Sequence, residues 1–268
     1  MSRAAGTLGR IACALIACAL GTLVADRAFA AAGVPAAISW LTSQQNADGS
    51  WGNDPRHPQL ALRDTAEVAV ALRLNAPHDP LVASALDALA ATASGAVDLE
   101  ARRLHALVSS GAAASLLASS ALAALAEARA PDGGWGLARQ FRFSDALDTA
   151  LAAQALARSS AVAFEDWPAA AARLASLQNL DGGYGQAVGE PSEPALSAEV
   201  LRGLVALSDV SVVDGIRAPL VHYLAALQNA DGGFPAAAGA PSDVTTTALA
   251  MRALELAGVS LGPTVKPR

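Results

Sequence analysis

Long stretches rich in alanine and leucine alternate along this chain with short polar segments that contain glycine. Because β-branched and aromatic residues are sparse, the composition favours helices over strands. The alternation predicts helices over residues 36–45, 59–74, 81–93, 98–109, 114–128, 144–158 and 242–257. Further helices are expected to follow the capping residues Asp166, Ser192 and Asp214, and Ser144 is expected to cap the helix at 144–158. The pattern therefore predicts an all-α chain of about ten helices in five hairpins.

The second helix of each hairpin is apolar over a wide arc. The fourth of these helices shows the arc with Ala195, Leu196, Val200, Leu201, Leu204 and Val205. A helix that meets water on one face would carry more charge there. We therefore expect the second helices to form an inner layer, packed on two sides, with a concave and largely apolar inner face.

One motif occurs four times. It reads Gln-Asn-Ala-Asp-Gly-Ser-Trp-Gly at residues 45–52 and returns with substitutions at residues 131–136, 178–185 and 228–235. Its aspartates are separated by 84, 49 and 50 residues, and they are Asp48, Asp132, Asp181 and Asp231. Repetition at such intervals is typical of repeat architectures. Because the first interval holds two repeats, it predicts a degenerate copy near residues 79–112 that has lost the motif.

The residues of the motif have a structural interpretation. Glycines supply positive φ angles that reverse the chain, at Gly49, Gly133, Gly182 and Gly232, and the preceding aspartates accept hydrogen bonds from turn amides. The aromatic residues are expected to fill the seam between consecutive hairpins, and they are Trp51, Trp135, Tyr184 and Phe234. The glutamines are expected to bind backbone groups of the neighbouring hairpin, and they are Gln45, Gln178 and Gln228, with Arg129 in the third copy.

The start of a second helix follows each motif at a nearly constant distance. The step from aromatic residue to helix start is 13 or 12 residues, and the start reads Asp-Thr-Ala at residues 64–66 and 148–150. This arrangement resembles the repeat of the terpenoid (squalene) cyclase and protein prenyltransferase β-subunit superfamily. The resemblance covers nearly all of residues 34–258 and implies an α/α-toroid whose inner helices line a central cavity. The family toroid contains more hairpins than the five expected here, so the sequence predicts either an α/α-toroid or an incomplete toroid and does not decide whether the ring is closed.

The catalytic signatures of that superfamily do not occur in the sequence. Squalene cyclases carry an Asp-x-Asp-Asp motif whose central aspartate protonates an alkene, and the nearest match here is Asp145-Ala146-Leu147-Asp148. Prenyltransferases hold zinc through Asp, Cys and His, and thioester-containing members need Cys-Gly-Glu-Gln. The only cysteines here are Cys13 and Cys18, close to the N-terminus. These absences favour a non-catalytic protein.

The N-terminal segment predicts export. Arg3 and Arg10 precede an apolar run over residues 11–24, and Ala28-Phe29-Ala30 provides a small-x-small cleavage site. This pattern is typical of a secretory signal peptide at residues 1–30. The expected mature protein is then a repeat domain at 31–262 with a short tail at 263–268, in the periplasm or secreted. In the alternative interpretation, residues 15–18 form a lipobox and the protein is a lipoprotein anchored at Cys18.

Charge limits the partners. Removal of residues 1–30 takes away three arginines and one aspartate, which changes the formal charge from −6 to −8. An acidic domain has no electrostatic attraction to nucleic acid or anionic lipid. The expected partner is a hydrophobic small molecule or a protein, and no later apolar run predicts a membrane span.

Four residues are candidates for chemistry. Asp64, Asp98 and Asp148 recur at the starts of inner helices, where a carboxylate caps the helix or, paired across a cavity, acts as acid and base. His105 lies on a predicted inner helix, with Arg102 on the same face. No two histidines have the i, i+4 spacing of a metal site, so we expect no metal and no cofactor.

Two functions follow from these observations. The first is a non-catalytic binding module for a hydrophobic ligand or a protein segment. The alternative is a terpenoid-cyclase-like or polysaccharide-degrading enzyme that uses the inner-helix carboxylates. A catalytic pair would lie within about 5 to 10 Å across a pocket.

Overall fold

A computed structural model describes residues 35–52, 58–92, 94–159, 167–207 and 210–259. The expected signal peptide, the C-terminal tail and the expected cap Asp166 lie outside these residues. A first helix covers residues 35–43. The remaining described helices are α2 (Pro58–Asn75), α3 (Pro80–Ala91), α4 (Val97–Ser109), α5 (Leu116–Glu127), α6 (Ala146–Arg158), α7 (Trp167–Leu177), α8 (Pro194–Ala206), α9 (Val213–Ala226) and α10 (Val244–Leu256). One small antiparallel pair, β1 (Phe234–Pro235) with β2 (Ser242–Asp243), precedes α10.

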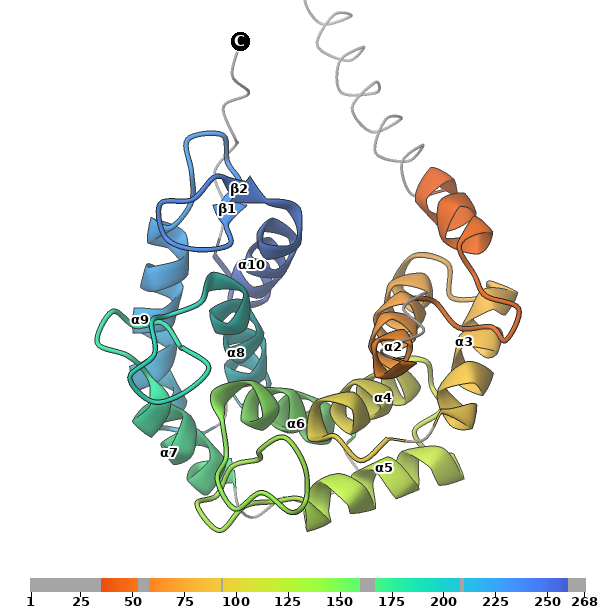
Figure 1. The fold of residues 1–268 in the computed structure, drawn as a ribbon, viewed down its shortest axis with the longest axis horizontal. Coiled ribbons are helices and arrows are strands. Elements are labelled where there is room, and N and C mark those ends of the chain that lie inside the picture. Colours follow the sequence, from red (N-terminus) through yellow and green to blue (C-terminus); the bar gives the residue numbers. More distant parts are fainter. Residues whose placement is uncertain (1–34, 53–57, 93, 160–166, 208–209, 260–268) are drawn as a thin grey trace, which may run out of the picture.

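The helices alternate between two layers of a curved arc (Figure 1). The inner layer consists of α2, α4, α6, α8 and α10, each of which packs against the next. The outer layer consists of the first helix, α3, α5, α7 and α9. The arc stays open between α2 and α10, and we call the concave space that it surrounds the lumen (Figure 1). The described residues thus form five helical hairpins, which confirms the prediction of an all-α protein with the α/α-toroid arrangement, and the open arc is the incomplete form.

The constant step between motif and inner helix comes from one hydrogen bond. The backbone N–H of each motif aromatic residue donates to a hydroxyl in the first turns of the following inner helix. The pairs are Trp51 with Thr65 (2.9 Å), Trp135 with Thr149 (3.0 Å), Tyr184 with Ser197 (2.9 Å) and Phe234 with Thr247 (2.8 Å). These bonds satisfy buried amides, so an insertion between motif and helix would leave them without a partner. We call these four residues the anchor hydroxyls.

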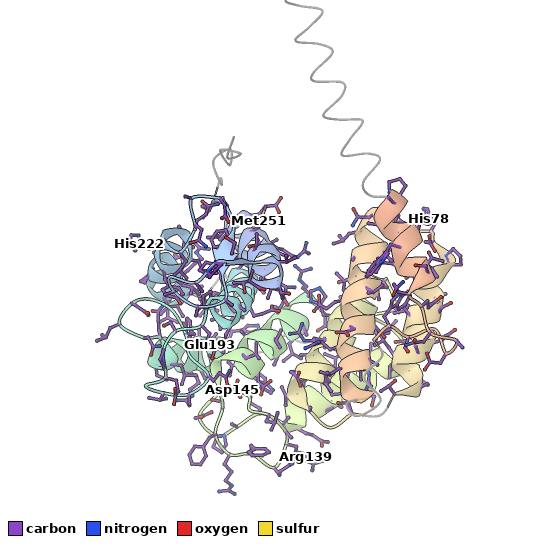
Figure 2. All side chains as sticks on the ribbon, turned by 45° about the horizontal axis from the view of Figure 1, so that its top comes forward. His78, Arg139, Asp145, Glu193, His222 and Met251 are labelled. Atoms are coloured by element: carbon purple, nitrogen blue, oxygen red, sulfur yellow. The ribbon has the colours of Figure 1, made fainter. Side chains whose placement is uncertain are left out.

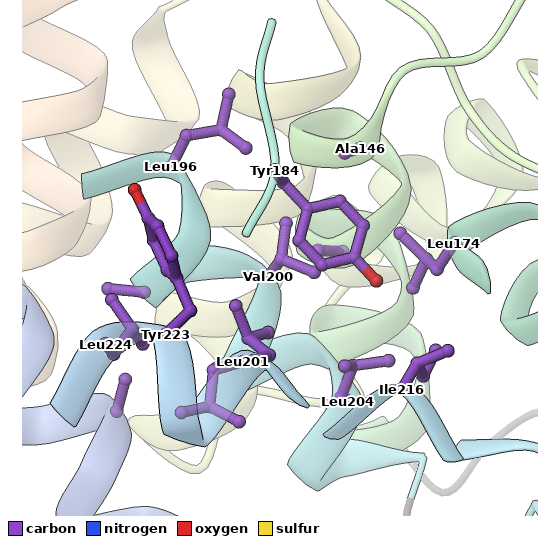
Figure 3. Close-up of a cluster of buried hydrophobic side chains, with 14 of the residues drawn as sticks. Ala146, Leu174, Tyr184, Leu196, Val200, Leu201, Leu204, Ile216, Tyr223 and Leu224 are labelled. Carbon is purple, nitrogen blue, oxygen red and sulfur yellow. The ribbon is translucent and has the colours of Figure 1, made fainter. Parts of the chain in front are cut away.

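The motif aromatics are core residues of the arc. Trp135, Tyr184 and Phe234 are fully buried, and Trp51 is nearly so. Figure 3 shows the ring of Tyr184 among side chains of α6, α7, α8 and α9, including Leu174, Val200 and Ile216. Tyr184 therefore packs against helices of three consecutive hairpins, its own and the two beside it.

The motif glycines lie against the next outer helix. Gly182 has φ +88°, and a Cβ there would stand 2.5 Å from the carbonyl oxygen of Pro219 in α9. Gly49 and Gly133 meet α3 and α7 in the same way. Gln178 adds a hydrogen bond of 2.8 Å to the carbonyl of Ile216, also in α9. The first three motif turns thus join their hairpins to the next one.

The motif aspartates close the turns. In every copy the carboxylate accepts a hydrogen bond from the amide two residues later, through Asp48, Asp132, Asp181 and Asp231. Among the described residues, Gln45 and Gln228 bind within their own motif, at the carbonyls of Gly49 and Gly232. Arg129, which replaces the glutamine in the third copy, bonds the carbonyl of Gly133 at 3.3 Å.

Two capping predictions are wrong. Asp145, not Ser144, caps α6 by accepting a hydrogen bond from the amide of Asp148. α8 follows Glu193, and Ser192 does not cap it. The hydroxyls of Ser144 and Ser192 instead donate to the motif aspartates Asp132 and Asp181, and this local turn competes successfully for the serines.

The starts of two helices also differ from the prediction. α9 begins at Val213, so Asp214 lies inside its first turn, where it pairs with Arg217, and Pro219 lies within the helix. α2 begins at Pro58, which places Asp64 in its second turn and not at its start. None of the described helices is both long and apolar enough to cross a membrane.

Candidate functional site

The anchor hydroxyls define which residues of the inner helices face the lumen. Each is the fourth residue of its helix in α6, α8 and α10, and Glu100 holds that place in α4. Three further positions of each inner helix lie two residues before, two after and five after the anchor. Successive positions are four and three residues apart, so all three share one helix face. The upper ring comprises Arg63, Asp98, Leu147, Ala195 and Thr245. The middle ring comprises Glu67, Arg102, Leu151, Glu199 and Leu249, and the lower ring comprises Val70, His105, Gln154, Arg202 and Arg252.

A cavity of about 510 Å³ opens at the end of the lumen formed by the helix N-termini. Its lining combines leucines with five carboxyl groups and one guanidinium: Asp98, Arg102, Leu137, Asp145, Leu147, Asp148, Gln186, Glu193, Ala195, Leu196, Glu199 and Leu249. Asp145 and Glu193 lie near each other at this end (Figure 2). The expectation of an apolar inner face holds for most of the cavity surface, but it did not foresee the carboxyl groups and the guanidinium. Ala195 and Leu196 of the arc that looks apolar in sequence line the cavity, whereas Val200, Leu201 and Leu204 are buried in the core.

A chain of ion pairs forms the floor of this cavity. Arg102 pairs with Glu67 of α2 and lies 3.5 Å from Glu199 of α8, whose other oxygen binds Arg202 at 2.7 Å. The side chain of Arg102 is only 12% exposed. Although burial acts against its charge, Glu199 and Glu67 raise the pKa of Arg102. Buried groups keep their charges when they are paired with opposite charges. The network of ion pairs links three inner helices, α2, α4 and α8, across the lumen.

Asp148 is the most perturbed carboxyl group in the cavity. It is 5% exposed, and burial raises its pKa to about 9, with further contributions from Asp145 and Asp98 that exceed the opposing effect of Arg102. Burial and neighbouring negative charge both disfavour the ionised form. Asp148 therefore carries a proton at neutral pH, beside the carboxylate of Asp145.

His105 lies below the ion-pair floor, in a narrow gap lined also by Gln154 and Arg202. Burial lowers its pKa to about 4, helped by Arg158, Arg202 and Arg252 and opposed by Glu67. The imidazole is therefore neutral at pH 7.

The structure brings together two of the three sequence-predicted carboxylates. Asp98 and Asp148 line the cavity, whereas Asp64 is partly exposed, pairs with Arg63 and is not part of its lining. The motif residues do not line it either. Sequence reasoning missed Glu193 and Glu199, although counting from Ser197 would have placed Glu199 on the same helix face as Arg102 on α4. Within the described residues no three His, Cys, Asp or Glu side chains gather where they could hold a metal ion.

Comparison with known proteins supports the fold. No family model and no curated protein matches the sequence. Among solved structures, the type II terpene cyclase MstE from Scytonema, with its product merosterolic acid A, is similar at a TM-score of 0.65 and 17% identity, covering 84% of this chain and 73% of that one.

Two carbohydrate-active proteins are similar as well. A family 88 glycosyl hydrolase from Bacteroides vulgatus matches at a TM-score of 0.51 and 14% identity, covering 80% of this chain and 77% of that one. A polysaccharide lyase matches at a TM-score of 0.51 and 12% identity, covering 75% of this chain and 74% of that one. At these identities the likenesses show the α/α-toroid fold, in agreement with the repeat motif.

Proposed function

We propose that this protein is a binding module that holds a small amphipathic molecule in the upper cavity of its lumen. The cavity itself carries this proposal. Its volume of about 510 Å³ lies within the range of ligand pockets, roughly 300 to 1,000 Å³. Leucines on its wall offer an apolar surface, and a few convergent polar groups would fix the orientation of a ligand.

The charge of the lining narrows the ligand class. Asp98, Asp145, Glu193 and Glu199 face one guanidinium, that of Arg102, and Asp148 is neutral. An anionic ligand would meet a negative potential there. A molecule with an apolar body and a neutral or cationic polar group fits this lining. The MstE structure holds an organic product, merosterolic acid A, which supports a small organic ligand for a protein of this fold. Export, as the N-terminal pattern predicts, would expose the cavity to molecules outside the cytoplasm.

Native mass spectrometry of the full chain isolated from its own cell envelope tests this function. We expect a co-purifying small molecule. Leu249→Trp fills the cavity wall and should abolish the additional mass, whereas Leu180→Trp, at a fully exposed position, should keep it. A ligand-free mass for the wild type, or a ligand that survives Leu249→Trp in a folded protein, would refute the proposal.

A second function is favoured by Asp148 alone. A carboxyl group that keeps its proton at neutral pH, with a carboxylate beside it, can donate that proton to an alkene or a glycosidic oxygen. Incubation with polyprenyl alkenes and with polysaccharides would then give products detectable by mass spectrometry. Asp148→Asn should remove this turnover while the ligand still binds. Products formed equally by Asp148→Asn would rule out the acid role.

A further inference from the structure

Three arginines lie at the opposite end of the lumen from the cavity. Arg202 of α8 and Arg252 of α10 occupy the lower ring, and Arg158 ends α6, one turn beyond that ring. α8 packs against both α6 and α10, so these three helices are consecutive in the inner layer. The arrangement directs three guanidinium groups toward one region.

These arginines lack sufficient negative partners. Arg202 binds Glu199 through Nη1 at 2.7 Å, but its Nε is buried without a hydrogen-bond partner. In the part of the chain that the structure describes, Arg158 and Arg252 form no ion pair or side-chain hydrogen bond. Arg202 is only 6% exposed, Arg252 is half-buried and Arg158 is exposed, so the cluster extends from the interior to solvent.

The positive charges of the three arginines repel one another. Burial lowers the pKa of Arg158, and Arg202 and Arg252 lower it further. All three arginines also lower the pKa of His105, and the carboxylate of Glu67 opposes this effect. The helix dipole favours a cation in the last turn of a helix. That effect accounts for Arg158, but Arg202 and Arg252 lie a full turn before the ends of α8 and α10.

We propose that Arg158, Arg202 and Arg252 form a binding site for an oxyanion with two negative charges, such as a phosphate or sulfate group. Guanidinium groups bind such oxyanions through paired, charge-assisted hydrogen bonds. Arg202 adds its positive charge at the inner end, and the other two arginines provide donors toward solvent. This site lies at the other end of the lumen from the upper cavity, whose acidic lining would repel the same ligand.

Titration calorimetry and thermal unfolding of the full chain, in a phosphate-free buffer of low ionic strength, test the site with inorganic phosphate. We expect saturable binding and a rise in Tm that sodium chloride at equal ionic strength does not reproduce. Arg252→Gln and Arg158→Gln should each weaken binding about tenfold or more, because each removes a charged donor. Arg217→Gln is the matched control, since this exposed arginine on α9 pairs with Asp214. It should bind as the wild type does.

Removal of one charge gives an independent test. Without phosphate, Arg252→Gln should melt at a higher temperature than the wild type, because it relieves repulsion and Arg252 lies a full turn before the end of its helix. Equal stabilisation by phosphate and chloride, unchanged binding in both variants, or a lower Tm for Arg252→Gln would overturn the proposal. Vesicles containing phosphatidic acid identify the source of the group. Cosedimentation that phosphate competes away supports a lipid headgroup, and phosphate binding without cosedimentation supports a free anion.

Discussion

The second hairpin, α3 with α4, differs from its neighbours because it has lost the motif. Where the motif is present, an anchor hydroxyl accepts the N–H of a buried aromatic residue. In α4 that position is Glu100, which binds Arg103 at 2.8 Å, and Arg103 in turn donates to the carbonyl of Thr92. A buried ion pair thus replaces the aromatic anchor, and burial outweighs Arg103 so that the pKa of Glu100 is raised.

The same hairpin also contributes charged and titratable residues to the lumen. α4 supplies Asp98 and Arg102 to the cavity and His105 to the gap below it. Motif-bearing hairpins on either side hold α4 in place, since it packs against α2, α5 and α6. The comparison shows that an array can diverge in one repeat while its neighbours maintain the fold. The divergent repeat carries the ion pair of Glu100 and Arg103 where the other repeats have an anchor hydroxyl.

Removal of a motif aromatic should have the largest effect. Trp135→Ala should lower the free energy of unfolding by about 3 to 5 kcal/mol, because a fully buried large side chain leaves a cavity. Urea denaturation followed by circular dichroism measures the change. Trp40→Ala is the control, because Trp40 is 62% exposed. A loss for Trp135→Ala no larger than that for Trp40→Ala would show that the aromatic does not hold the seam.

The ion pair of the second hairpin should come next. Glu100→Gln leaves the buried charge of Arg103 without its partner and should cost about 3 kcal/mol. The double variant Glu100→Thr with Arg103→Ala reproduces the residues of the third hairpin, Thr149 and Ala152, at the equivalent positions. It should recover much of the loss in the same denaturation experiment. A double variant as unstable as Glu100→Gln would show that the pair does not replace the anchor.

The third prediction concerns pH and a second pair of equivalent positions. Asp148 is the residue directly before the anchor hydroxyl of α6, and the equivalent residue of α4 is Leu99, directly before Glu100. Of these two side chains, that of Asp148 can ionise. Because its pKa is raised to about 9 in the folded state, the folded protein binds the additional proton, and stability should fall as pH rises from about 4 to about 9. Between pH 6 and pH 8 the loss attributable to this group should reach about 3 kcal/mol, because each pH unit contributes about 1.36 kcal/mol.

Asp148→Asn should remove that dependence, as should any side chain that cannot ionise. Denaturation midpoints of both proteins measured across this range provide the test. Parallel pH profiles for the wild type and the variant would contradict the protonated state of Asp148.

The smallest effect is expected for an anchor hydroxyl. Thr149→Val keeps the shape of the side chain but leaves the amide of Trp135 without its acceptor, at a cost of about 1 kcal/mol or more. Thr245→Val, at an exposed position of α10, serves as the control in the same experiment. An equal, negligible change in both variants would show that the hydroxyl does not fix the step between motif and helix.

The sequence alone determined the repeat, the helical hairpins and the turns that join them. These features follow from interactions within a few residues: alanine-rich helices, glycines with positive φ, and aspartates that bind nearby amides. Even locally, Ser144 and Ser192 were assigned to the wrong partner, because a serine before a helix can bind either its own helix or the preceding turn.

Only the tertiary structure decided which residues meet in the lumen. Arg102 and Glu199 are 97 residues apart, and the proton on Asp148 depends on its burial beside Asp145 and Asp98. The sequence pattern could not distinguish the helix face that packs outward from the face that lines the lumen, because alanine and leucine dominate both layers. The curvature and twist of the arc bring distant charges together. Those charges alter one another's ionisation only once water has been excluded from between them.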